Sequence, residues 1–191
     1  MIGYFFWHWP GGKALDVYER DLLAFHSALR AHHPDGFSCC TAARVAGAPW
    51  IPGARGYEDR YLVDSFAALG TLNEAAVSPS LSAPHEAIAR QASGGTGGLY
   101  RLKFGDAASS VNRGAIWFSK PPAMTYPELD EVLGLVLQRG AALWQRQLTL
   151  GPTPEFCLDF SGRPELPAGS QPIFSKSGSV HDLSKNASVG P

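Results

Sequence analysis

The stretch YFFWHWPGGKALDVYERDLL, residues 4–23, decides how the chain begins to fold. It starts with a run of aromatic residues that ends at Pro-Gly-Gly, the pattern of a strand that stops at a tight turn. Beyond the turn, apolar residues recur at alternating spacings of three and four, which predicts a helix with one apolar stripe. The stripe consists of Leu15, Tyr18, Leu22, Phe25 and Leu29. We therefore expect a strand followed by a helix that packs on the sheet containing that strand.

The same alternation of strands and helices continues through the first half of the chain. Hydrophobic patterning predicts strands at residues 36–47, 57–65 and 99–105, and helices at residues 65–77 and 84–92. The order strand, helix, strand, strand, helix, strand is that of a split βαβ unit, the ferredoxin-like fold.

The chain then repeats its opening pattern. The stretch AIWFSKPPAMTYPELDEVLGLVL, residues 115–137, aligns with the opening stretch when Pro121 is set on Pro10. Each stretch contains an aromatic strand, a proline stop, a short loop and a helix that begins with acidic residues. We interpret the match as the start of a second, partial unit.

This organisation predicts one domain, residues 1–162, in which a first unit at residues 1–105 is followed by the partial unit at residues 114–162. The partial unit is predicted to contain a strand, a helix from Pro127 to about Gln147 and a strand at residues 154–160. Beyond it the composition turns to Ser, Gly, Pro, Asn and Lys. Residues 163–191 are therefore predicted to form a polar, flexible tail.

The order of elements over about residues 1–160 resembles that of the dimeric α/β-barrel superfamily. The resemblance implies an α+β fold in which an antiparallel sheet carries helices on one face and curls around a pocket. Because the second unit holds only strand, helix, strand, either a partner chain closes the barrel, which implies a homodimer, or the duplication is coincidental. Members of the superfamily include cofactor-free monooxygenases, muconolactone-type isomerases, haem-binding enzymes and proteins without known activity.

Composition excludes several classes of partner. The chain has 191 residues, of which 45% are hydrophobic and 17% charged, and a formal net charge of −1. It contains no run of basic residues, so neither nucleic acid nor a membrane surface is expected as a partner. It also lacks a transmembrane stretch and the pattern of a signal peptide, and its three cysteines, an odd number, are expected to be reduced. These features predict a cytoplasmic protein whose partner is a small molecule.

Period-two alternation assigns residues of the predicted strands to faces of the sheet. One face collects aromatic side chains with polar tips and a carboxylate, so we expect it to line the pocket, while the purely apolar rings lie under the helices. The residues on the pocket face are Tyr4, Phe6, His8, Tyr57, Asp59 and Tyr61. The internal alignment adds Trp117, as the counterpart of Phe6.

A histidine in an aromatic wall beside a carboxylate can act as a general base. We expect His8 to take a proton from the substrate and Asp59 to orient its ring. Tyr57 or Tyr61 would donate a hydrogen bond to a developing oxyanion, and the Tyr4, Phe6 and Trp117 side chains would bind a flat substrate. The alternative is that His8 is a core or strand-end histidine, satisfied by a backbone carbonyl.

Other motifs lead to weaker hypotheses. Arg146 either binds an anionic substrate or forms an ion pair with Glu155. HEAIA, residues 85–89, lacks the second histidine of the HExxH zinc motif, so no metal site is predicted. SGGTGG, residues 93–98, is predicted to be a flexible connection or a lid.

We therefore expect an enzyme that binds a planar, largely apolar metabolite and performs acid/base or cofactor-independent oxidative chemistry, as a monooxygenase or as an isomerase or cyclase. One alternative is a ligand-binding or dimeric scaffold protein without turnover. Another is a haem-binding protein, with His8, His26 or His85 as the axial ligand. His26 follows Phe25 at the edge of the helix stripe and is expected to be partly exposed.

Overall fold

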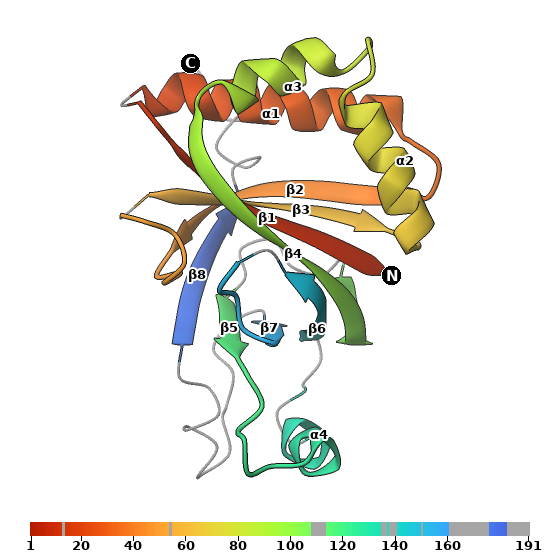
Figure 1. Cartoon of the computed structure of the whole chain (residues 1–191), viewed down its shortest axis with the longest axis vertical. Helices are drawn as coiled ribbons and strands as arrows, with labels where there is room; N and C mark the ends of the chain where they lie inside the picture. The colour runs from red at the N-terminus through yellow and green to blue at the C-terminus, as the bar shows by residue number, and fades with distance from the viewer. Residues whose placement is uncertain are drawn as a thin grey trace.

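The computed structural model describes residues 1–12, 14–53, 55–107, 114–134, 137, 141–149, 151–160 and 176–182 (Figure 1). The first unit contains β1 (Ile2–Pro10), α1 (Leu15–His32), β2 (Phe37–Ala46), β3 (Gly56–Val63), α2 (Phe66–Ala76), α3 (Ser82–Ala89) and β4 (Ala92–Gly105). The second contains β5 (Gly114–Phe118), α4 (Tyr126–Gly134), β6 (Ala142–Thr149), β7 (Phe156–Phe160) and β8 (Lys176–Asp182). The predicted order of the first unit is confirmed.

The described strands form a closed antiparallel barrel in the order β1-β3-β2-β8-β5-β7-β6-β4. Within each unit the strands take the same order, β4-β1-β3-β2 in the first and β8-β5-β7-β6 in the second. The predicted α+β fold with an antiparallel barrel-like sheet is thus confirmed. Pairing of β2 with β8 and of β4 with β6 closes the barrel within one chain, so closure by a partner chain, one of the two alternatives left open by the sequence, is wrong. A homodimer stays a prediction.

Helices cover the outside of the barrel on two sides. In Figure 1, α1, α2 and α3 lie together over the first unit, and α4 lies at the far end of the molecule, beside the second unit. Each group of helices packs on the outward-facing apolar side chains of its own unit. Among the helices described, none is long and apolar enough to span a membrane.

An ion cluster lies buried inside the barrel. The Arg60 guanidinium donates to both oxygens of Asp159, from Nη2 to Oδ1 at 3.0 Å and from Nη1 to Oδ2, and its Nε donates to Glu58 at 2.7 Å. The Trp7 indole donates to Glu58 at 2.9 Å, and the Trp144 indole donates to Asp159 at 3.0 Å. Buried charges persist when they are paired and hydrogen-bonded, as here. Because Arg60 is on β3 and Asp159 on β7, the cluster joins the two units.

The predicted helix from Pro127 to about Gln147 is wrong in its second part. α4 ends at Gly134, and β6 occupies much of the remainder. In β6, Leu143 packs on the outer apolar cluster of the second unit, whereas Trp144 points into the barrel. This period-two alternation is required by the pairing of β6 with β4 and β7, and such long-range pairing overrides the local helix propensity of the sequence.

The predicted tail, residues 163–191, is not without regular structure. Lys176–Asp182 form β8, which pairs with β2 and with β5 and so fills the last place in the barrel. The sequence of β8, KSGSVHD, has a single aliphatic residue, so hydrophobic alternation could not reveal it. The remainder of the predicted tail lies outside the described residues.

The glycine-rich stretch at residues 93–98 is neither a flexible connection nor a lid, because it forms the first part of β4. Large rings of the neighbouring β1 lie across these glycines. A Cβ added at Gly95 would lie 2.5 Å from the ring of Phe6, and one at Gly97 would lie 2.9 Å from the ring of Tyr4. Glycine is therefore required here for close approach of side chains to the strand.

We predict that Gly95→Ala lowers the free energy of unfolding by about 1–3 kcal/mol, because the added methyl group would contact both the Phe6 ring and the Trp7 carbonyl oxygen. Urea unfolding followed by fluorescence measures the change. Gly12→Ala is the matched control, because a Cβ at Gly12 meets nothing within 4 Å. Equal stability of the two variants would contradict this packing role.

Candidate functional site

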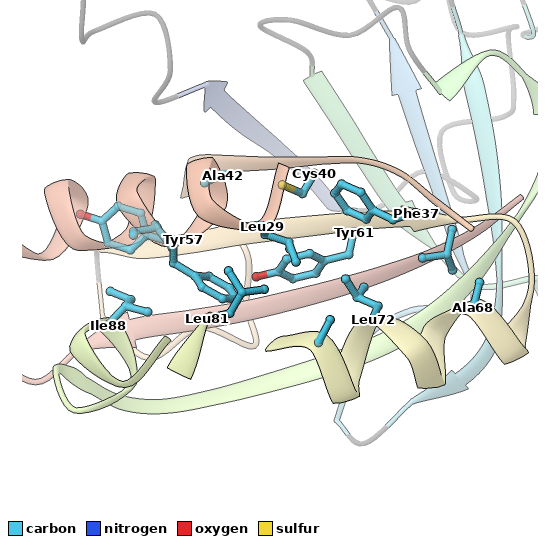
Figure 2. Close-up of a cluster of buried hydrophobic side chains, with 14 of the residues drawn as sticks. Leu29, Phe37, Cys40, Ala42, Tyr57, Tyr61, Ala68, Leu72, Leu81 and Ile88 are labelled. Atoms are coloured by element: carbon cyan, nitrogen blue, oxygen red, sulfur yellow. The ribbon is translucent and has the colours of Figure 1, made fainter. Parts of the chain in front are cut away.

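A cavity of about 800 Å³ lies between the outward face of the first unit's sheet and the helices α1, α2 and α3. Figure 2 shows the buried apolar side chains between this sheet and the helices: Tyr57 and Tyr61 come from β3, and Leu29, Leu72 and Ile88 from the helices. The wall of the cavity is mostly apolar. It suits a flat or elongated apolar ligand.

Polar side chains gather around Asp59 of β3. The Asp59 carboxylate lies 3.3 Å from Nε2 of His8 on β1 and 3.2 Å from Nε2 of His26 on α1. It also accepts a hydrogen bond from the Tyr61 hydroxyl at 3.0 Å. The other ring nitrogen of His8, Nδ1, is hydrogen-bonded to the hydroxyl of Tyr18. All five side chains are buried, so a charge here is shielded from water.

Strand register and helix periodicity together build this cluster. β1 pairs with β3 so that Phe6 lies opposite Asp59 and His8 lies opposite Tyr57. Alternation then places His8 and Asp59 on the outward face, beneath α1. On α1, His26 follows Leu22 by four residues, which places it on the buried stripe of the helix directly above the carboxylate.

Two atoms of the cluster that belong to residues of the cavity wall lack a directed hydrogen bond. Nε2 of His8 and Oδ1 of Asp59 are buried but have no aligned hydrogen-bond partner among the described residues. The imidazole–carboxylate contacts are therefore charge contacts at ion-pair distance rather than well-directed hydrogen bonds. Because His8 and Asp59 both line the cavity, a polar group of a bound ligand can satisfy these atoms.

The charges of Asp59 and His26 stabilise one another. Burial raises the pKa of Asp59, but the attraction of His26 and His8 outweighs burial and lowers its pKa below the usual range. Burial likewise lowers the pKa of His26, but the charge of Asp59, with a smaller effect of Cys40, raises that pKa to about 10. Asp59 is therefore an anion and His26 a cation at neutral pH.

The nearby tyrosines remain protonated. Burial, with the charge of Asp59 as a second cause, raises the pKa values of Tyr18 and Tyr61 above the usual range. Burial and a hydrogen bond to Glu19 raise the pKa of Tyr57 to about 12. A neutral hydroxyl group has one proton to donate. Tyr61 donates its proton to Asp59, whereas Tyr18 can act as either donor or acceptor toward Nδ1 of His8.

The structure brings most of the predicted site residues together. Tyr4, Phe6, His8, Asp59 and Tyr61 all line the cavity. The predicted side of the sheet, however, is wrong, because these residues face the helices and the barrel interior is filled with aromatic side chains. Alternation sorts residues into two faces, but it does not show which face the helices cover.

Tyr57 lies next to the cluster rather than in the cavity wall. Its ring stacks on His8, with ring centroids 5.7 Å apart, and its hydroxyl donates to Glu19 at 2.9 Å. The structure therefore places Tyr57 behind His8, where it fixes the position of the imidazole ring.

Trp117 and Arg146 lie away from the cavity. The Trp117 ring packs inside the barrel, 5.2 Å from that of Trp7. Trp117 thus shares a face with Trp7 rather than with Phe6, so the internal alignment is one residue out, and a shift of one residue exchanges the faces of a strand. Arg146 on β6 donates to the backbone carbonyl of Thr153 at 2.6 Å, which is neither of the two predicted partners.

Sequence reasoning missed His26 and Tyr18 as members of the cluster. The expectation that His26 is partly exposed is wrong: its exposed fraction is 0%. The signal was present, because His26 stands four residues after Leu22 and three before Leu29 and so belongs to the apolar stripe. Tyr18 was recognised as part of that stripe, but its partner His8 is set only by the tertiary packing of α1.

The metal and haem hypotheses depend on which potential ligand side chains lie together or line the cavity. No group of three or more His, Cys, Asp or Glu side chains is placed there to hold a metal ion. His26 is buried against Asp59 and is not part of the cavity wall, whereas His8 and His85 are. Nδ1 of His8 is hydrogen-bonded to Tyr18, so only its Nε2, which lies 3.3 Å from the Asp59 carboxylate, could contact a group bound in the cavity.

Neither a family model nor a curated protein matches the sequence. Solved structures of similar fold include the following two. A "putative monooxygenase" from Fusobacterium nucleatum subsp. nucleatum ATCC 25586 has a TM-score of 0.63 at 9% identity, over 95% of this chain and 92% of that chain. An anthrone oxidase-like protein has a TM-score of 0.51 at 8% identity, over 100% of this chain and 78% of that chain. At these identities the comparisons show a shared α/β-barrel fold.

The Asp59–His26 pair predicts how stability depends on pH. The pKa of His26 is raised from 6.5 to about 10, so its contribution is complete below about pH 6.5 and is lost as the pH rises toward 10. The pKa of Asp59 is lowered from 3.8, so its contribution is complete above about pH 3.8 and is lost in stronger acid. We expect the stability to be highest between these limits.

Chemical unfolding at a series of pH values tests this linkage. The free energy of unfolding of the wild type should fall between pH 7 and pH 10, and His26→Gln should remove most of that fall. Other groups titrate in this range, so the difference in slope between the two proteins is the informative quantity. Parallel slopes would show that His26 does not carry a proton in the folded state.

Proposed function

We propose that the protein is an enzyme that binds a planar, largely apolar molecule in the cavity under α1, α2 and α3 and removes a proton from it with His8. Asp59 orients the imidazole and stabilises the imidazolium that forms. Once the imidazolium has formed, its Nδ1–H donates to the Tyr18 oxygen, and the Tyr18 hydroxyl can then donate its own proton in a hydrogen bond to the substrate anion.

The observation that supports this proposal is the contrast between the two units of the same chain. His8 pairs with Tyr57 across β1 and β3, and the corresponding pair across β5 and β7 is Phe118 with Phe156. Both pairs are stacked, with ring centroids 5.7 Å and 5.2 Å apart. The fold thus accommodates two phenylalanine rings where the first unit has a histidine and a tyrosine.

The next pair of positions shows the same contrast. Phe6 pairs with Asp59 in the first unit, and Ile116 pairs with Leu158 in the second. In the second unit these side chains pack directly against Leu129 and Leu133 of α4. The buried carboxylate of Asp59 is therefore not required by the fold, and burying it costs free energy. A role in binding or chemistry accounts for its presence.

Oxidation without a cofactor is consistent with this site. Removal of a proton from an activated CH₂ group, followed by reaction of the carbanion with O₂, converts the CH₂ to a carbonyl group and releases one molecule of water. The electrons that reduce O₂ come from the substrate, so no separate reductant is required. The two proteins of similar fold are described as a monooxygenase and as anthrone oxidase-like, which supports this reaction class over isomerisation or cyclisation by the same base.

A ligand-binding protein without turnover is the second candidate. It would use the same cavity, and the apolar wall alone would hold the ligand. The buried Asp59–His26 pair and the unsatisfied Nε2 of His8 favour the enzyme, because a charged cluster in an apolar cavity weakens the binding of a neutral apolar ligand.

We predict that His8→Phe abolishes turnover while the protein stays folded, because phenylalanine occupies the equivalent place in the second unit. O₂ uptake with anthrone as the probe should fall on the order of 10²–10⁴-fold, and Asp59→Asn should also lower it. The melting temperature of His8→Phe should fall by only a few degrees, because the buried Tyr18 hydroxyl loses its partner on His8. Phe118→Leu is the control, since it changes the equivalent place away from the cavity. Full turnover by His8→Phe, or none by the wild type, would contradict the proposal.

A further inference from the structure

The cavity is open on one side, and two large apolar side chains lie exposed at the opening. Phe66 of α2 and Leu148 of β6 both line the cavity, yet 47% and 57% of their surfaces are exposed. Gly70, one turn after Phe66 on α2, also lines the cavity, and a Cβ there would meet nothing within 4 Å. Exposed lining residues mark the mouth, which therefore lies between α2 and the strands β4 and β6.

The polarity of the wall changes between the mouth and the buried cluster. Leu69 of α2 and Leu99 of β4 are half-buried and continue the apolar wall inward from Phe66 and Leu148. The cluster around Asp59, by contrast, is buried. A ligand that fits both parts must carry its polar group deep in the cavity and its apolar part toward the mouth.

We infer that the substrate is an elongated amphiphile: a ring with an acidic hydroxyl or methylene group binds at His8 and Asp59, and an apolar chain extends between Leu69 and Leu99 to the mouth at Phe66 and Leu148. The position of the ring rests on the proposed function, and the chain is the new element. A chain in this place would cover apolar side chains that are otherwise exposed to water, which is a favourable change.

A series of 4-alkylphenols tests the inference, because these probes share one head group and differ only in the length of the chain. Binding to the wild type is measured by titration calorimetry with 4-ethylphenol, 4-butylphenol and 4-hexylphenol. Each methylene group that the wall covers should raise the affinity about fourfold. From ethyl to hexyl the gain should therefore be on the order of 10²-fold.

A substitution at the mouth of the cavity distinguishes the contribution of the alkyl chain to binding from that of the phenol head group. Gly70→Trp places a large ring in the opening, so the affinity for 4-hexylphenol should fall at least tenfold while that for 4-ethylphenol stays unchanged. Gly134→Trp is the matched control, because Gly134 is also an exposed helical glycine with nothing within 4 Å of an added Cβ, and it lies on α4 away from the cavity. This control should bind every probe as the wild type does.

The outcomes distinguish the inference from the proposed function. If 4-ethylphenol binds and His8→Phe weakens that binding, but affinity does not rise with chain length, the head group is placed correctly and the inferred chain is wrong. An equal loss for short and long probes in Gly70→Trp would also overturn the inference. If no alkylphenol binds, or if His8→Phe binds all of them unchanged, both the inference and the proposed site are contradicted.

Discussion

The barrel depends on the buried ion pair between Arg60 and Asp159, which joins the two units at their centre. Removing one partner would leave a buried charge uncompensated, at a cost of about 3–5 kcal/mol. The pair also fixes the orientation of β3. Because Arg60 and Glu58 point into the barrel, alternation requires Asp59 between them to point outward, beneath α1. The position of the candidate site is therefore a consequence of the interaction that joins the two units.

The two units share an architecture, but one contains an ordinary apolar core and the other a cavity with buried charges. On the outward face of the second unit, Phe118, Phe156 and Leu158 pack against α4 as an ordinary apolar core. The equivalent face of the first unit carries His8 and Asp59, and its helices stand over a cavity of about 800 Å³. A cavity and a buried charge each lower stability. The second unit, filled with apolar side chains, and the shared barrel interior offset that loss.

The sequence predicted the first unit well because its hydrophobic periods are long and regular, as in the helix stripe through Leu22 and Leu29. It also predicted that His8 and Asp59 lie together, since both follow from alternation on neighbouring strands. It could not predict β8, whose residues carry almost no hydrophobic pattern and pair only because the barrel closes. Nor could the sequence show which face of the sheet Trp117 occupies. The internal alignment can shift by one residue without losing its pattern, and only the strand register shows which alignment is right.

In the proposed mechanism, His26 would act through the charge balance of a buried cluster. Asp59 and His26 carry opposite charges and together are neutral. If His8 takes a proton from the substrate, as we propose, the cluster would gain one positive charge, which would face the substrate anion. Without His26, the proton on His8 would only neutralise Asp59, and no cation would lie near the substrate anion in the apolar cavity. A second histidine on the same carboxylate would thus allow the cluster both to accept a proton and to stabilise the anion that forms.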